Sequence, residues 1–139
     1  GAAESGHKLA VITGGEPLMH DLTSVSDNMR NYGYKLHLET SGAYPLSGQW
    51  DWITLSPKKI KPPLSEIYPF ASELKIIIYN NNDFDWAIDQ ARKVNKSCLL
   101  YLQPEWSQIE KMKSKIFNFL SHNPRWKLSL QMHKYLNIK

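Results

Sequence analysis

The chain has 139 residues, which is enough for one compact domain with its own core and too short to assume two. Hydrophobic residues make up 42% of it, charged residues 22%, and no apolar run approaches the roughly 20 residues that a membrane-spanning helix needs. The net charge of +4 is carried by dispersed lysines, so charge alone identifies no anionic partner.

The single cysteine, Cys98, excludes an intrachain disulfide and a cluster held by three cysteines of this chain. The most natural role for it is that of a small core residue. A lone cysteine suits a reducing compartment, and the N-terminus shows no basic end followed by an apolar stretch, as a secretory signal would. We therefore expect a cytoplasmic protein.

The first half of the chain alternates between short apolar runs and one helical pattern. Residues 9–13 (LAVIT) predict a buried strand that ends in a glycine turn. Residues 22–32 have apolar side chains at helical spacing, with Asp21 able to cap the helix and Gly33 able to end it. Two further strands are predicted over residues 35–40 and 52–55.

The second half continues the alternation. Residues 58–69 contain three prolines and no clear period, so we expect a loop, whereas residues 74–79 (LKIIIY) are the strongest strand signal. Asp83 is the expected N-cap of a helix over residues 84–94. A strand over 98–103, a helix over 107–122 and a last strand over 126–131 complete the pattern.

Strands that alternate with helices predict parallel β-α units, and thus one α/β domain over residues 1–139 with a mostly parallel sheet and outer helices. The strands are apolar throughout, which is typical of a sheet covered on both faces. Lys75 is an exception inside a strand. A strand lysine that loses water usually needs a partner, so a structural ion pair near Glu73 is expected for it.

Polar residues cluster just after the predicted strands. Ligands of parallel α/β folds bind at the carboxyl ends of the strands, so these clusters together predict a site there. The clusters occupy residues 13–17, 39–42 and 56–58, then Gln103, and finally Gln131, His133 and Lys134.

The first cluster is the turn Thr13-Gly14-Gly15-Glu16-Pro17. Its two glycines allow the backbone to approach a ligand closely, its glutamate supplies a carboxylate, and its proline fixes the chain behind it. The spacing matches neither a dinucleotide fingerprint nor a phosphate-binding P-loop. A plain tight turn with an exposed glutamate is the alternative.

A strand that ends in TGGEP resembles the radical S-adenosylmethionine superfamily, in which this turn contacts the amino group of the methionine moiety. The motifs ETSG, DWITLSPK, ELK, YLQP and WKLSLQMHKYLNI, in that order, are similar to those of 7-carboxy-7-deazaguanine synthase. The resemblance covers nearly all of residues 9–138.

The resemblance implies a radical-mediated ring contraction of 6-carboxy-5,6,7,8-tetrahydropterin, with loss of ammonia, on the route to queuosine. It implies S-adenosylmethionine, a [4Fe–4S] cluster and Mg²⁺ as cofactors, an electron donor such as flavodoxin, and a homodimer. By motif, the S-adenosylmethionine site comprises Gly14, Gly15, Glu16, Pro17, Ser56 and Lys58. The pterin site comprises Glu39, Gln103, Gln131 and His133, although Glu39 could equally cap a turn and His133 could be a surface histidine.

The sequence departs from the family in one respect. Members carry three cysteines upstream of GGEP that hold the cluster, and no cysteine precedes residue 9 here. We therefore expect the C-terminal portion of such an enzyme, an incomplete barrel that is inactive as written, and we assign no metal-binding residue.

Two other functions are compatible with the sequence. One is a catalytically dead relic of the superfamily that acts as an interaction module. The other is a basic domain that binds nucleic acid through Lys58, Lys59, Lys61 and nearby aromatic residues. The lysines do not interleave with aromatic residues along one element, which argues against the second.

Overall fold

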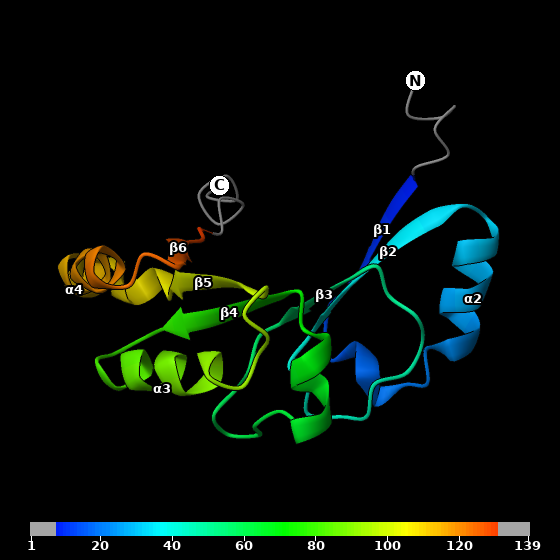
Figure 1. Ribbon diagram of the computed structural model, residues 1–139, viewed down its shortest axis with the longest axis horizontal. Helices are drawn as coiled ribbons and strands as arrows, with labels where there is room; N and C mark the ends of the chain where they lie inside the picture. The colour runs from blue at the N-terminus through cyan, green and yellow to red at the C-terminus, as the bar shows by residue number, and fades with distance from the viewer. Residues whose placement is uncertain (1–7, 131–139) are drawn as a thin grey trace.

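Six short segments pair into one parallel sheet in the computed structural model, which describes residues 8–130 (Figure 1). The strands lie side by side in the order in which they occur in the chain, and every neighbouring pair is parallel. The predicted parallel α/β sheet is confirmed. Its strands are β1 (Lys8–Ile12), β2 (Tyr34–Thr40), β3 (Trp52–Leu55), β4 (Glu73–Ile78), β5 (Leu99–Pro104) and β6 (Trp126–Leu128).

The helices contact the strands that precede or follow them in the chain. In Figure 1, α2 lies beside β2 at one end of the sheet, and α3 and α4 lie along β4 and β5 at the other. The α-helices are α2 (Thr23–Asn31), α3 (Asn82–Ala91) and α4 (Ile109–His122). Short 3₁₀ helices fill the remaining connections: η1 (Pro17–Met19), η2 (Ser65–Phe70) and η3 (Trp106–Gln108). Among residues 8–130, no helix is long and apolar enough to cross a membrane.

The hydrophobic core lies between the sheet and the helices, on one side of the sheet. Along β4, Leu74, Ile76 and Ile78 are fully buried in this core, whereas Ile77 points the other way and is 38% exposed. Val11 on β1 is likewise 45% exposed. The predicted outer position of the helices is confirmed, because the connections that the structure describes all pass on the same side. The expectation that both faces of the sheet are covered is wrong for these exposed strand residues.

We call the helix-free side of the sheet the open face. Strand side chains alternate between the two faces, so every second residue of each strand lies on it. Its members include Lys35 of β2, Glu73, Lys75 and Ile77 of β4, Tyr101 of β5, and Lys127 of β6.

The predicted end of α2 is confirmed, because Gly33 follows the helix with a φ of 89°. At its start the N-cap is Leu22, and Asp21, one residue earlier, accepts a hydrogen bond from the Thr23 amide at 3.0 Å. Asp83, however, is not the N-cap of α3, because the helix already begins at Asn82. Its carboxylate instead accepts hydrogen bonds from the amides of Tyr79 and Asn80, just after β4. It also forms an ion pair with Lys59, in the loop that follows β3. The segment 58–69, expected as a loop, also contains the start of η2.

One-sided burial predicts unequal losses of stability for substitutions at two adjacent isoleucines. We expect Ile76→Ala to lower the free energy of unfolding by about 2–5 kcal/mol, because it leaves a cavity in the core. Ile77→Ala is the matched control on the open face and should cost less than about 1 kcal/mol. Urea denaturation of both variants measures the difference, and equal losses would mean that both faces are packed.

Candidate functional site

A cleft of about 220 Å³ opens at the carboxyl ends of β1, β2 and β3, where the sequence predicts a site. It joins three segments that are far apart in the chain: the turn after β1, the end of β2, and the residues just after β3. Its lining consists of Thr13, Gly15, Glu16, Glu39, Thr40, Ser41, Ser56 and Lys58. Five of the ten residues singled out by motif therefore meet in one place.

The glycine turn after β1 leaves its backbone accessible. Gly14 and Gly15 have φ angles of 84° and 45°, a region that other residues rarely adopt. A Cβ atom on either glycine would meet no other heavy atom within 4 Å, so the space beside the turn is open. Main-chain groups of this turn can consequently approach a ligand in the cleft.

The Glu16 carboxylate ties this turn to the end of β2. One oxygen accepts the Thr40 hydroxyl at 2.6 Å and the Leu18 amide at 2.9 Å. The other oxygen accepts the Ser41 amide at 2.8 Å and the Ser41 hydroxyl at 2.9 Å. A carboxylate has about four acceptor positions, so all of them are used within the protein.

These contacts also set the ionisation of Glu16. Partial burial acts to raise the pKa of the carboxyl group, but the hydrogen bonds from Thr40, Ser41 and Leu18 favour the charged form and hold the pKa below its ordinary value. The side chain is a hydrogen-bonded anion that joins the turn to β2. The plain alternative of an exposed glutamate in a tight turn is wrong, whereas direct contact of Glu16 with a ligand stays a prediction.

Two oppositely charged side chains of the cleft retain capacity for a ligand. Glu39 accepts the Thr13 hydroxyl at 3.0 Å through Oε1, and no group within residues 8–130 donates to its Oε2. The amine of Lys58 has no hydrogen-bond or ion-pair partner in the described part of the chain. A carboxylate and an ammonium across one small cleft suit a zwitterion, such as the amino-acid end of a larger ligand.

Two other residues predicted by motif, Pro17 and Gln103, do not line this cleft. Pro17 is buried at the start of η1, where its fixed φ suits the first helical position. Gln103, at the end of β5, is 3% exposed, and its Oε1 has no donor among the described residues. Gln131 and His133 lie outside the described residues.

Sequence reasoning assigned no role to three further residues that line the cleft: Thr13, Thr40 and Ser41. The motifs could have indicated them, because Thr13 belongs to TGGEP, and Thr40 and Ser41 belong to ETSG. Their hydroxyl and amide groups orient the two glutamates.

The described residues hold no group of three or more His, Cys, Asp or Glu side chains that could bind a metal ion. Cys98 is 2% exposed, and burial raises the pKa of its thiol to about 11. A cluster ligand must be a thiolate, so this residue does not fit a [4Fe–4S] cluster. It is a core side chain, as the sequence suggested.

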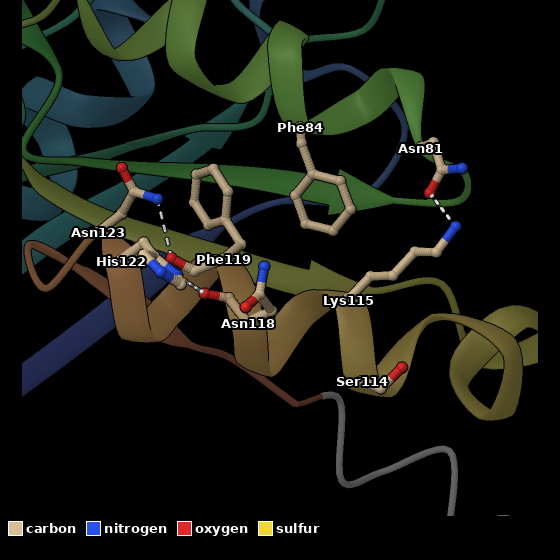
Figure 2. A pocket seen from close by; sticks show the side chains of 8 residues that line it. All are labelled: Asn81, Phe84, Ser114, Lys115, Asn118, Phe119, His122 and Asn123. Carbon is tan, nitrogen blue, oxygen red and sulfur yellow. Dashed lines mark hydrogen bonds between the residues drawn. The ribbon is translucent and has the colours of Figure 1, made fainter.

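A second cavity, of about 540 Å³, lies between α3 and α4 on the helix-covered side (Figure 2). The rings of Phe84 and Phe119 line it, with their centroids 5.2 Å apart. At its edge, the Lys115 amine donates a hydrogen bond to the Asn81 side-chain oxygen at 2.9 Å. None of the residues that line it belongs to the sequence motifs. It is separate from the cleft at the strand ends.

Comparisons with known proteins agree with these motifs. No family model matches the chain. It is 57% identical to the 7-carboxy-7-deazaguanine synthase of Synechocystis sp. over 93% of this chain and 62% of the relative, and 33% identical to that of Prochlorococcus marinus over 99% and 71%. The chain thus spans about three fifths of the length of its more similar relatives.

A solved structure agrees as well. The chain superposes on the crystal structure of QueE from Escherichia coli with a TM-score of 0.76 and 27% identity, over 94% of this chain and 60% of the other. This likeness confirms the expected fold, an incomplete version of the superfamily's barrel.

Removing the charge of Glu16 tests its structural role. We expect Glu16→Gln to lower the free energy of unfolding by about 1–2 kcal/mol, because an amide cannot accept all four hydrogen bonds and the site is partly exposed. Glu105→Gln is the matched control, since Glu105 caps η3 in a similar way without joining two strands. It should cost less than about 0.5 kcal/mol by urea denaturation.

The lowered pKa of Glu16 also predicts how the effect of Glu16→Gln on stability depends on pH. The stabilisation from Glu16 is fully present above the ordinary pKa of 4.5 and is lost as the pH falls through the lowered folded-state pKa. The stability difference between the wild type and Glu16→Gln should therefore be constant above that pH and shrink below it. A difference that grew in acid would contradict the assigned direction of the shift.

Proposed function

Because the chain belongs to the 7-carboxy-7-deazaguanine synthase family, we propose that it serves the conversion of 6-carboxy-5,6,7,8-tetrahydropterin to 7-carboxy-7-deazaguanine with loss of ammonia. The observation that carries the proposal is the convergence of Gly15, Glu16, Glu39, Ser56 and Lys58 on one cleft. These residues come from three strand ends, and their motifs match the family in order.

The cleft residues suit the amino-acid end of S-adenosylmethionine. Lys58 would pair with the ligand's carboxylate, because its amine has no partner within residues 8–130. The ligand's ammonium would meet main-chain oxygens of the glycine turn and the free oxygen of Glu39, since the four acceptor positions of Glu16 are already filled. Glu16 contributes by holding the turn in place.

Gln103 is proposed to bind the pterin. Its buried Oε1 lacks a donor among the described groups, and an unpaired buried acceptor costs free energy until a donor reaches it. The amino and ring N–H groups of a pterin are such donors. A site of this kind rejects an analogue that lacks the donor. Gln131 and His133 are proposed for the same role on motif alone.

In the superfamily a [4Fe–4S] cluster supplies the electron that cleaves S-adenosylmethionine. The residues of this chain do not fit the cluster, because the one cysteine is buried in the core. Mg²⁺, an electron donor such as flavodoxin, a homodimer and a cytoplasmic location are further proposals from the family.

The alternative of nucleic-acid binding gains no support. Lys59 is paired with Asp83, and Lys61 stacks over the Tyr44 ring at 4.2 Å while it donates to the ring's hydroxyl at 3.1 Å. These contacts turn two of the three loop lysines toward the protein. An interaction module without catalysis differs from the proposal in a testable way, since it has no need to bind S-adenosylmethionine.

Calorimetric titration with S-adenosylmethionine tests the proposed cleft. We expect saturable binding that Lys58→Ala weakens roughly ten- to a hundredfold, which corresponds to the loss of one charge-assisted hydrogen bond. Lys111→Ala removes the same charge from an exposed position of α4 and should leave the affinity unchanged. Absence of binding, or equal losses in both variants, would refute the assignment of the cleft.

A further inference from the structure

Three side chains of neighbouring strands form a row on the open face. Lys75 of β4 lies in register with Tyr101 of β5, which in turn lies in register with Lys127 of β6. Their chain neighbours Leu74, Leu100 and Trp126 are buried in the core, so the three side chains point to the opposite side. Adjacent strands lie about 4.8 Å apart, which places two positive charges on either side of a phenol.

The row has no counter-charge within the described residues. The expected structural ion pair of Lys75 is absent there, because no carboxylate between residues 8 and 130 lies within ion-pair distance of it or of Lys127. The nearest acid along β4, Glu73, instead accepts the indole N–H of Trp52 at 2.9 Å. No described group bonds the Tyr101 hydroxyl either.

Lys75 is also partly buried, in contrast to an ordinary surface lysine. Partial burial strips water from the ammonium, and an anion is what restores the lost interaction. A phenol O–H beside an ammonium offers two donors to one carboxylate. The row is therefore arranged to receive a single anionic group from outside.

The row begins next to the proposed cofactor cleft. Leu55 of β3 pairs with Leu74 of β4, so Ser56, which lines the cleft, is level with Lys75. One step further along β4, Ile77 is 38% exposed on the same face and provides an apolar surface. A flat ring system over Ile77 could place an attached carboxylate at Lys75 while it remained beside the cleft.

We propose that Lys75 and Tyr101 bind the carboxylate of the pterin substrate, with Lys127 as a second positive charge, and thereby select 6-carboxylated pterins over neutral ones. This inference rests on the proposed function and adds the group that sets substrate specificity. A charge-assisted contact that only the carboxylated substrate makes is worth about ten- to a hundredfold in affinity.

Fluorescence titration with two probes, 6-carboxypterin and unsubstituted pterin, tests the inference in the presence of S-adenosylmethionine. The wild type should bind 6-carboxypterin more tightly. Lys75→Met keeps the apolar stem and should weaken 6-carboxypterin about ten- to a hundredfold while leaving pterin unchanged. Lys75→Arg should retain the preference. Lys35→Met, on the open face of β2, is the matched control and should change neither affinity.

The outcomes separate the two proposals. Equal weakening of both probes by Lys75→Met, or a wild type that binds S-adenosylmethionine without preferring 6-carboxypterin, would overturn the carboxylate site and leave the proposed function standing. A wild type that binds neither S-adenosylmethionine nor a pterin would overturn the proposed function itself. Circular dichroism checks folding, and if Lys75→Met does not fold, Tyr101→Phe must reduce the preference for the inference to survive.

Discussion

One partly buried carboxylate, that of Glu16 with its four hydrogen bonds, determines the shape of the cleft. Two consecutive glycines give the turn after β1 access to a ligand, but they also leave it without side chains that could anchor it. The Glu16 carboxylate supplies the missing anchor by accepting groups of Thr40 and Ser41 at the end of the neighbouring strand. The turn can be both accessible to a ligand and fixed in conformation because the Glu16 side chain is directed toward β2.

This arrangement divides the work of the two glutamates. Glu16 faces the protein, and Glu39 keeps an oxygen for the cleft. The two residues look alike in the sequence, since each lies near the carboxyl end of a strand and belongs to a recognisable motif. The inward orientation of Glu16 depends on donors that lie 24 and 25 residues further along the chain, and the pattern of a single motif contains no such information.

The sequence predicted the fold well where local pattern and tertiary packing agree. The segment 52–55 was identified with its correct bounds, and the meeting of the TGGEP, ETSG and SPK segments followed from the rule that parallel strands end at one edge. It failed to predict one-sided burial. A run such as LKIII in β4 is apolar in every case, whether its second face meets helices or an open surface, so composition could not separate these possibilities.

The order of the strands has a consequence for how the sheet assembles. Each strand from β2 to β6 pairs with the strand that precedes it in the chain. The two strands of every pair are therefore separated by a single connection, and no pairing requires a more distant segment. The contact order of the sheet is correspondingly low for a parallel fold, and each unit can dock on a surface that is already complete. A chain that emerges from the ribosome could thus add β2 to β1, and each later strand in turn, before its C-terminal residues have been synthesised.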